Sequence, residues 1–143
     1  MQHGTVLHHV GYVVESIQKA AATFAASLAL DWDGRIIHDP LQQVCVSFFQ
    51  PRSPGNPVFE LVEPASQDSP VAGFLRRGGG YHHLCYEVDS LEEQLGIVRE
   101  NGDLIARMPL PAVAFDGRRI AWVFTRNNML LEYLERRKPG PGA

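Results

Sequence analysis

Residues 8–17 read HHVGYVVESI, and residues 82–91 read HHLCYEVDSL. The two stretches lie 74 residues apart and are identical at five of ten positions. Average residue frequencies would give roughly half an identity over that length, so the match indicates an internal repeat. A second match supports the repeat, because FELVE at 59–63 corresponds to LEYLE at 131–135 with an offset of 72.

Alternation of side chains predicts the strands. Bulky apolar residues alternate with small or polar residues over 10–14 and again over 84–88, which is typical of half-buried strands. Each half therefore opens with a strand. Three more strands are expected in each half, at 33–37, 44–49 and 58–62 in the first and at 104–108, 120–125 and 129–134 in the second.

A helix is expected after each opening strand. Ser16 is an N-cap, and apolar residues recur at helical spacing from there to Leu28. Ser90 opens a capping box at the start of the second helix. A short third helix is expected at 69–77, before the triple glycine at 78–80, which we interpret as a hinge.

The order βαβββ, twice over, predicts an α+β fold of two tandem βαβββ modules. Module one spans residues 5–64, a linker spans 65–80 and module two spans 81–136, while residues 137–143 are expected to form a disordered tail. Modules of roughly 70 residues are marginal alone, so we expect them to share one core.

The alternation of side chains along a strand places two histidines on one face of the sheet. Residues two apart share a face, and the bulky apolar residues of each opening strand must pack under the following helix. This leaves His9 with Gly11, and His83 with Cys85, on the opposite face. Alone, a histidine pair in a strand is more often structural than metal-binding, because local hydrogen bonds commonly satisfy it.

Two glutamates repeat with the histidines. Glu60 and Glu132 stand between apolar neighbours in the closing strands, where a carboxylate is costly to bury without compensation. Glu63 and Glu135 end those strands and are expected to be solvent-exposed. Two imidazoles and two carboxylates without a thiolate suit a divalent ion such as Mn, Fe, Co, Ni or Zn, and four protein ligands leave octahedral positions open for a substrate.

The stretches HHVGYVV, FELVEP, SPVAGFLRRGGGYHHLCYEV and LLEYLE together resemble the vicinal oxygen chelate superfamily of glyoxalases, bleomycin resistance proteins and dioxygenases. The resemblance covers residues 5–136 and is nearest to methylmalonyl-CoA epimerase and its relatives. It implies a single domain with a cupped mixed sheet around a central divalent metal, commonly as a homodimer. The family's metal positions fall on His9, Glu60, His83 and Glu132, and the epimerase type can carry Gln where Glu60 stands.

The resemblance also implies the chemistry. The ion would coordinate a substrate through adjacent oxygens, and an isomerase or lyase would abstract the proton next to the carbonyl to give a metal-stabilised enolate. The expected substrate is a small molecule, in the epimerase case an acyl-CoA thioester. The glutamate expected as the base corresponds to Leu41 here, so Asp39, or a metal-bound Glu60 or Glu132 that leaves the ion, is the candidate base.

Three alternatives remain open for this set of residues. A glyoxalase I-type lyase would use the same four ligands, and a non-haem iron dioxygenase would need only three of them. A drug-binding resistance protein would need no metal, and retention of all four ligands argues against it. Five arginines could bind an anionic substrate, although each is expected to be a solvated surface residue: Arg76, Arg77, Arg118, Arg119 and Arg126.

The composition excludes other classes of partner. The 143 residues are 45% hydrophobic and 20% charged, which is typical of a globular domain. Thirteen Lys and Arg against sixteen Asp and Glu give a net charge of −3 without a basic run, so no nucleic-acid partner is expected. No apolar run approaches the roughly 20 residues of a membrane span, and the first residues do not resemble a signal peptide. We therefore expect a cytoplasmic protein with reduced Cys45 and Cys85.

Overall fold

The computed structural model describes residues 4–137, so residues 138–143 of the predicted tail lie outside the described part. The elements follow the order β1 (Val6–Val13), α1 (Ile17–Leu28), β2 (Leu30–Trp32), β3 (Ile37–Asp39), β4 (Val44–Pro51), β5 (Val58–Pro64), α2 (Ala72–Arg76), β6 (Gly80–Val88), α3 (Leu91–Asn101), β7 (Leu104–Pro111), the 3-10 turn η1 (Val113–Phe115), β8 (Arg119–Phe124) and β9 (Leu130–Glu135).

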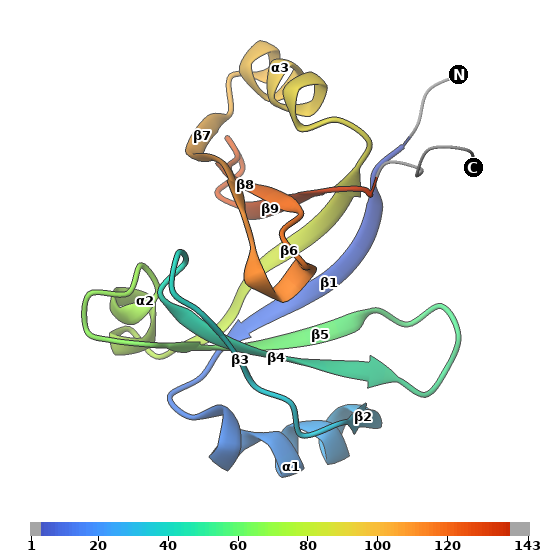
Figure 1. The fold of residues 1–143 in the computed structure, drawn as a ribbon, viewed down its shortest axis with the longest axis vertical. Helices are drawn as coiled ribbons and strands as arrows, with labels where there is room; N and C mark the ends of the chain where they lie inside the picture. The colour runs from blue at the N-terminus through green and yellow to red at the C-terminus, as the bar shows by residue number, and fades with distance from the viewer. Residues whose placement is uncertain (1–3, 138–143) are drawn as a thin grey trace.

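The strands of the described range form one mixed sheet in the order β2-β4-β5-β1-β6-β9-β8-β7, with β3 paired to β4. At its centre β1 and β6 pair antiparallel, and each pairs in parallel with the closing strand of its own half, β5 or β9. Figure 1 shows that the sheet bends into a cup, with α1 outside one half and α3 outside the other. The predicted α+β fold of two tandem modules in a cupped mixed sheet is confirmed.

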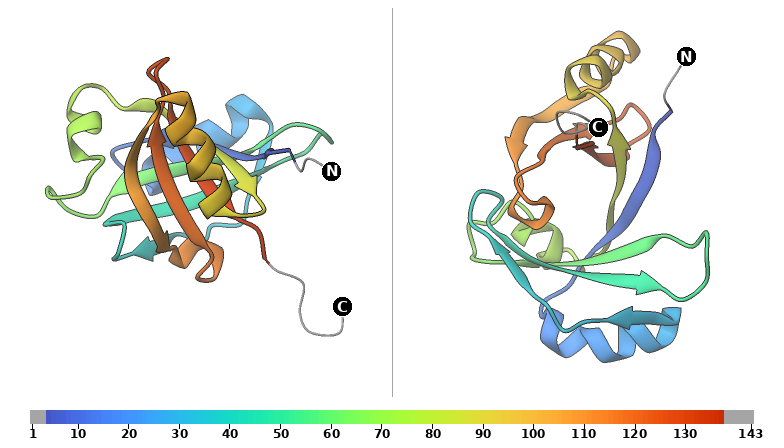
Figure 2. Two further views of the ribbon diagram at one scale, coloured as in Figure 1. Left: turned by 90° about the horizontal axis from the view of Figure 1, so that it is seen from above. Right: turned by 45° about the vertical axis from the view of Figure 1, so that its right-hand side comes forward.

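The helices cover the convex side of each half, and Figure 2 shows α3 lying across the strands of the second half. Both helices begin as predicted, because Ser16 Oγ accepts a hydrogen bond from Lys19 N and Ser90 Oγ accepts one from Glu93 N, each at 3.2 Å. Their buried apolar stripes pack on the sheet, Ile17 and Ala21 from α1 and Leu91, Leu95 and Val98 from α3. Each large apolar side chain buried in this way contributes about 1.5 to 3 kcal/mol to stability.

The prediction that Glu63 and Glu135 are solvent-exposed is wrong. Glu63 Oε1 accepts a hydrogen bond from Ile17 N at 2.8 Å, and Glu135 Oε2 accepts one from Leu91 N at 3.1 Å. Each closing strand therefore ends against the first turn of its own module's helix, where backbone N–H groups lack partners and favour a negative charge. The arrangement is the same in both halves.

The predicted strand at 33–37 is also wrong. The chain forms two short strands there, β2 and β3, separated by a turn. Asp33 Oδ1 accepts a hydrogen bond from Arg35 N at 2.8 Å, and Gly34 has a φ of +80°, which is a left-handed conformation. An aspartate that bonds two residues ahead and a glycine at positive φ favour a turn over an extended strand.

The linker contains a short helix, as predicted, but α2 covers only Ala72–Arg76. The three glycines at 78–80 all have positive φ, which glycine adopts without strain, and the predicted hinge there stays a prediction. Both cysteines are free thiols. Among residues 4–137, no helix has the length and apolar character that crossing a membrane would require.

Candidate metal centre

The register of the four central strands brings the predicted quartet together. One row of strand partners contains Glu60 on β5, Gly11 on β1 and His83 on β6. The next row contains His9 on β1, Cys85 on β6 and Glu132 on β9. Partners across a sheet present their side chains on the same face, so all four polar side chains lie on the concave face.

The four side chains converge on a small volume. His9 Nε2 and His83 Nε2 lie 3.2 Å apart. Glu60 Oε1 is 3.4 Å from His9 Nε2 and 3.3 Å from His83 Nε2, and Glu132 Oε1 is 3.2 Å and 3.5 Å from the same two atoms. Atoms that each bind one ion at about 2.0 to 2.2 Å lie roughly 3 to 3.5 Å from one another, as the atoms of the quartet do. The quartet therefore has the dimensions of a metal site.

The orientation of these atoms also fits a metal. Glu132 Oε1 is fully buried and has no hydrogen-bond partner, although it lies 3.2 Å from His9 Nε2. A buried carboxylate oxygen without a partner costs free energy. With both imidazoles neutral, the quartet carries a charge of two negatives, which a divalent cation would neutralise. The residues present therefore fit the implied ion.

The buried charges strongly affect one another. Burial alone lowers the pKa of His9, but the Glu60 charge and close polar contacts with Cys85 and both glutamates raise it well above its ordinary value. Burial opposes ionisation of Glu60 and Glu132, yet contacts with His9 and His83 hold both carboxyl pKa values below their ordinary value. Without a cation, the site is therefore held by proton sharing between imidazoles and carboxylates, and metal binding would release protons.

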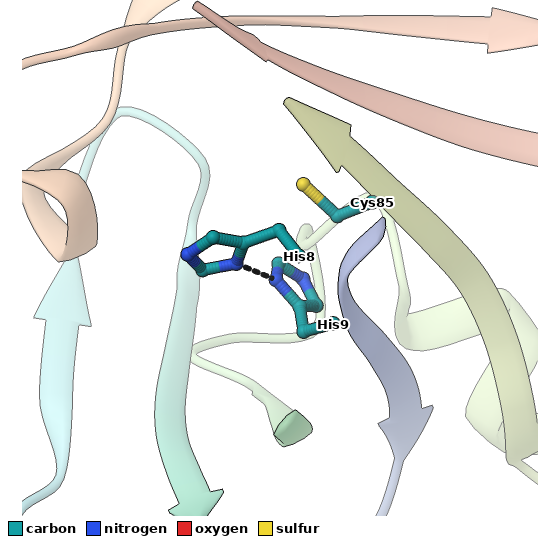
Figure 3. Close-up of side chains that lie close together, drawn as sticks. All are labelled: His8, His9 and Cys85. Atoms are coloured by element: carbon teal, nitrogen blue, oxygen red, sulfur yellow. Dashed lines mark hydrogen bonds between the residues drawn. The ribbon is translucent and has the colours of Figure 1, made fainter. Parts of the chain in front are cut away.

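The small residues between the ligands are part of the site. A Cβ at Gly11 would lie 2.1 Å from His83 Cε1 and 2.6 Å from His83 Nε2, so only glycine leaves room for the ring. Its repeat counterpart, Cys85, carries a side chain beside His9 (Figure 3), within 4.8 Å of ligand-type atoms of His8 and His9. Burial raises the pKa of the Cys85 thiol, so it is a neutral group and a poor metal ligand.

A cavity of about 340 Å³ lies over the quartet, and Glu60, His83 and Glu132 line it. This volume is within the range of roughly 300 to 1,000 Å³ for small-molecule sites. Apolar residues, valines and alanines above all, form most of the wall, and the polar residues Gln42, His82 and Arg107 also contribute. These three residues were not predicted from the sequence, although the repeated His-His doublet was a signal for His82. No ion pair involving Arg107 is found within residues 4–137.

Asp39 also lines the cavity, but its carboxylate already accepts hydrogen bonds from backbone N–H groups. Asp39 Oδ1 accepts hydrogen bonds from Leu41 N and Gln42 N at 3.0 and 3.1 Å, and Oδ2 accepts one from Val113 N at 3.1 Å. These bonds tie β3 to η1. Leu41, the position where the resemblance places a base, is 51% exposed and does not line the cavity, whereas its neighbour Gln42 is buried against it.

Two of the five candidate arginines are engaged in ion pairs. Arg118 pairs with Glu87 at 3.2 Å, and Arg119 pairs with Glu92 and Glu135 at 2.8 Å each. Arg126 Nη1 donates to a backbone carbonyl, that of Asn101, at 3.4 Å. None of the five lines the 340 Å³ cavity; the arginine that does is Arg107.

A family model described as the glyoxalase/bleomycin resistance protein/dioxygenase superfamily matches residues 8–122. The uncharacterized protein YqjC of Bacillus subtilis (strain 168) is 35% identical over 136 residues, which cover 90% of this chain and 91% of that protein. The ethylmalonyl-CoA/methylmalonyl-CoA epimerase of Cereibacter sphaeroides is 29% identical over 130 residues, covering 88% and 94% of the two chains.

Solved structures share the fold over nearly the whole chain. A hypothetical protein from Bacillus halodurans C-125 has a TM-score of 0.81 at 30% identity, covering 98% of this chain and 100% of that one. A variant of Streptomyces coelicolor methylmalonyl-CoA epimerase in complex with 2-nitronate-propionyl-CoA has a TM-score of 0.78 at 18% identity, covering 94% and 99%. At that identity the second likeness shows the fold alone.

Proposed function

The chain belongs to the glyoxalase/bleomycin resistance protein/dioxygenase superfamily, and from this we propose that it is a divalent-metal-dependent, methylmalonyl-CoA epimerase-like isomerase. The observation that carries the proposal is the buried quartet of His9, Glu60, His83 and Glu132, three of which line a cavity. Relatives named as acyl-CoA epimerases support this reaction class over the others on the same fold.

The four residues would hold Co, Ni, Zn, Mn or Fe through two imidazole nitrogens and two carboxylate oxygens. When bound, the ion would polarise the carbonyl oxygens of the substrate, which makes the neighbouring C–H bond more acidic. The chain's own residues then have two tasks. They must place the acidic carbon beside a carboxylate, and they must keep water away from it.

Epimerisation removes a proton from one face of a carbon and returns a proton to the other face. Glu60 and Glu132 line the cavity and come from opposite modules, so they offer a proton acceptor on each side. We propose that Glu60 takes the proton in this chain, because its carboxylate lines the cavity and Leu41 stands at the position of the epimerase-type base. Relatives of the epimerase type that carry Gln at the position of Glu60 would use that other base. Asp39 is the weaker candidate because three backbone N–H groups already bond to it.

The cavity also favours an anionic acyl group. Arg107 reaches it from β7, and a guanidinium binds a carboxylate through two parallel hydrogen bonds. A cavity of about 340 Å³ accommodates a small branched acyl chain, so the nucleotide part of an acyl-CoA thioester would lie outside it.

We further propose that the protein acts in the cytoplasm as a homodimer. Sedimentation at micromolar concentration would test the dimer.

The test is hydrogen exchange at the acidic carbon. Methylmalonyl-CoA is incubated in D₂O with chelator-treated protein, with and without added Co²⁺, and loss of the C2 proton signal is followed by NMR. Exchange that requires both protein and Co²⁺ supports the proposal. Glu60→Gln should keep Co²⁺ binding and lose exchange, whereas Asp39→Asn should keep both. No exchange by Co²⁺-loaded protein would refute the epimerase assignment.

The same preparation tests the alternatives. Turnover of a glutathione hemithioacetal instead of methylmalonyl-CoA would indicate a glyoxalase I-type lyase. Oxygen uptake with a catechol and Fe²⁺ would indicate a dioxygenase. Ligand binding that is unchanged by chelator, without turnover, would indicate a drug-binding protein.

A further inference from the structure

Each ligand histidine follows another histidine, and the two pairs have the same geometry. His8 Nδ1 lies 2.8 Å from His9 Nδ1, as the dashed line in Figure 3 shows, and His82 Nδ1 lies 2.8 Å from His83 Nδ1. In both pairs the ring centroids are 5.1 Å apart and the rings are nearly perpendicular, at 79° and 88°. The arrangement therefore occurs in both modules.

The positions of the protons follow from the metal site. A neutral imidazole has one N–H donor and one bare nitrogen acceptor. If His9 and His83 bind an ion through Nε2, their Nδ1 atoms must carry the hydrogen and donate it. The acceptors at 2.8 Å are the Nδ1 atoms of His8 and His82, whose own hydrogens must then be on Nε2.

Aromatic contacts hold the two outer rings in place. The His8 ring packs edge-on against Phe115 with centroids 5.4 Å apart, and the His82 ring packs edge-on against Phe74 with centroids 4.9 Å apart. His82 also contacts Trp122 at 6.1 Å. Rings fixed in this way can impose an orientation on their neighbours, which freely rotating side chains cannot do.

We propose that His8 and His82 are positioning residues, which fix the Nδ1–H tautomer and the ring orientation of His9 and His83 so that both Nε2 atoms face the ion. The inference rests on the proposed metal function. Metal-binding histidines usually donate this hydrogen to a carboxylate, a backbone carbonyl or water. The neutral imidazole of His8 or His82 accepts this hydrogen without adding charge. The quartet therefore keeps its charge of −2, which matches a divalent ion.

The first arm of the test compares two substitutions at each position. His8→Phe and His82→Phe keep a packed ring but remove the acceptor, whereas His8→Asn and His82→Asn keep an acceptor oxygen near the position of Nδ1. Calorimetric titration with Co²⁺ measures affinity, and the visible spectrum of bound Co²⁺ reports ligand geometry. Each Phe variant should bind about 10- to 100-fold more weakly with an altered spectrum, and each Asn variant should recover most of the loss.

The second arm needs no metal. Nitrogen-15 NMR of the metal-free protein with labelled histidine should show bare Nδ1 atoms in His8 and His82 and protonated Nδ1 atoms in His9 and His83. The opposite assignment overturns the inference. So does equal Co²⁺ affinity in wild type and Phe variants, or an Asn variant as weak as its Phe counterpart.

The two proposals fail in different ways. If wild-type protein takes up no Co²⁺ at all, the proposed metal function fails, while the NMR arm still decides whether the outer histidines fix the tautomers. If wild type binds Co²⁺ and the Phe variants bind it equally well, the positioning role fails and the metal function stands. Circular dichroism melting of each variant checks that the fold is retained.

Discussion

Replacing Gly11 by alanine would place a methyl group inside the space that the His83 ring occupies. The added Cβ would lie 2.1, 2.5 and 2.6 Å from Cε1, Nδ1 and Nε2 of that ring. Carbon atoms pack at about 3.5 to 4.0 Å, so the ring must retreat by roughly 1.4 Å or more. The backbone itself tolerates alanine, because Gly11 is absent from the glycines with positive φ.

The consequence for the metal site is larger than that for the fold. Ligand distances in metal sites hold to within about 0.2 Å, so a displaced His83 can no longer bind an ion with its partners. Loss of a hydrogen bond to a metal ligand typically weakens metal binding by about 10- to 100-fold. Because Gly11→Ala displaces a ligand itself, we expect it to weaken Co²⁺ binding by more than about 100-fold. Overpacking should cost about 1 to 3 kcal/mol of unfolding free energy in the metal-free protein.

The assay is urea unfolding of metal-free protein and calorimetric titration with Co²⁺. Gly96→Ala is the matched control, because Gly96 lies in α3 and, apart from its chain neighbours and the helix's own backbone, nothing lies within 4 Å of its added Cβ. It should leave Co²⁺ affinity unchanged and stabilise the helix by roughly 0.5 to 1 kcal/mol. In a His83→Ala background, Gly11→Ala should lose most of its destabilising effect. Wild-type affinity and stability in Gly11→Ala would show that the missing side chain at position 11 is not needed to place the His83 ring.

Three further predictions concern residues around the site and the helices. Cys85→Ala should leave Co²⁺ affinity unchanged in titration, because a Cβ at position 85 already fits beside His9; a large loss would show that the thiol is needed. Glu63→Ala should lower the unfolding free energy by about 1 kcal/mol through loss of the acceptor for Ile17 N, while exposed Glu15→Ala should not, as urea midpoints would show. Hydrogen bonding to Arg119 lowers the pKa of Glu135, so this group stabilises the fold above its ordinary pKa of 4.5 and loses that effect as the pH falls through its folded value. The stability difference between wild type and Glu135→Gln should therefore shrink below about pH 4.5, and a pH-independent difference would contradict it.

The repeat explains why so much of the site was predictable. A duplicated core retains apolar residues for packing, so polar residues that recur at matched positions, such as His9 and His83, stand out from the pattern. The register then places them on one face without further information. The same logic applied to both helices, whose N-caps Ser16 and Ser90 are local signals.

The features that were predicted wrongly or not at all depend on contacts between residues distant in sequence, or on the conformation of a single turn. Glu63 resembles an exposed residue at a strand end until the fold brings Ile17 N to it, 46 residues away. Arg107 reaches the cavity from β7, and no local pattern marks it. The turn at Asp33 and Gly34 overrides a short apolar run through one hydrogen bond and one positive φ.

The proposed site has one divalent ion bound by both modules at once. Anomalous diffraction from crystals grown with Co²⁺, measured at the cobalt absorption edge, tests it most directly. We expect a single strong peak about 2.0 to 2.2 Å from Nε2 of His9 and His83 and from a carboxylate oxygen of Glu60 and Glu132. A peak bound by one module alone, or no peak between these residues at saturating Co²⁺, would contradict it.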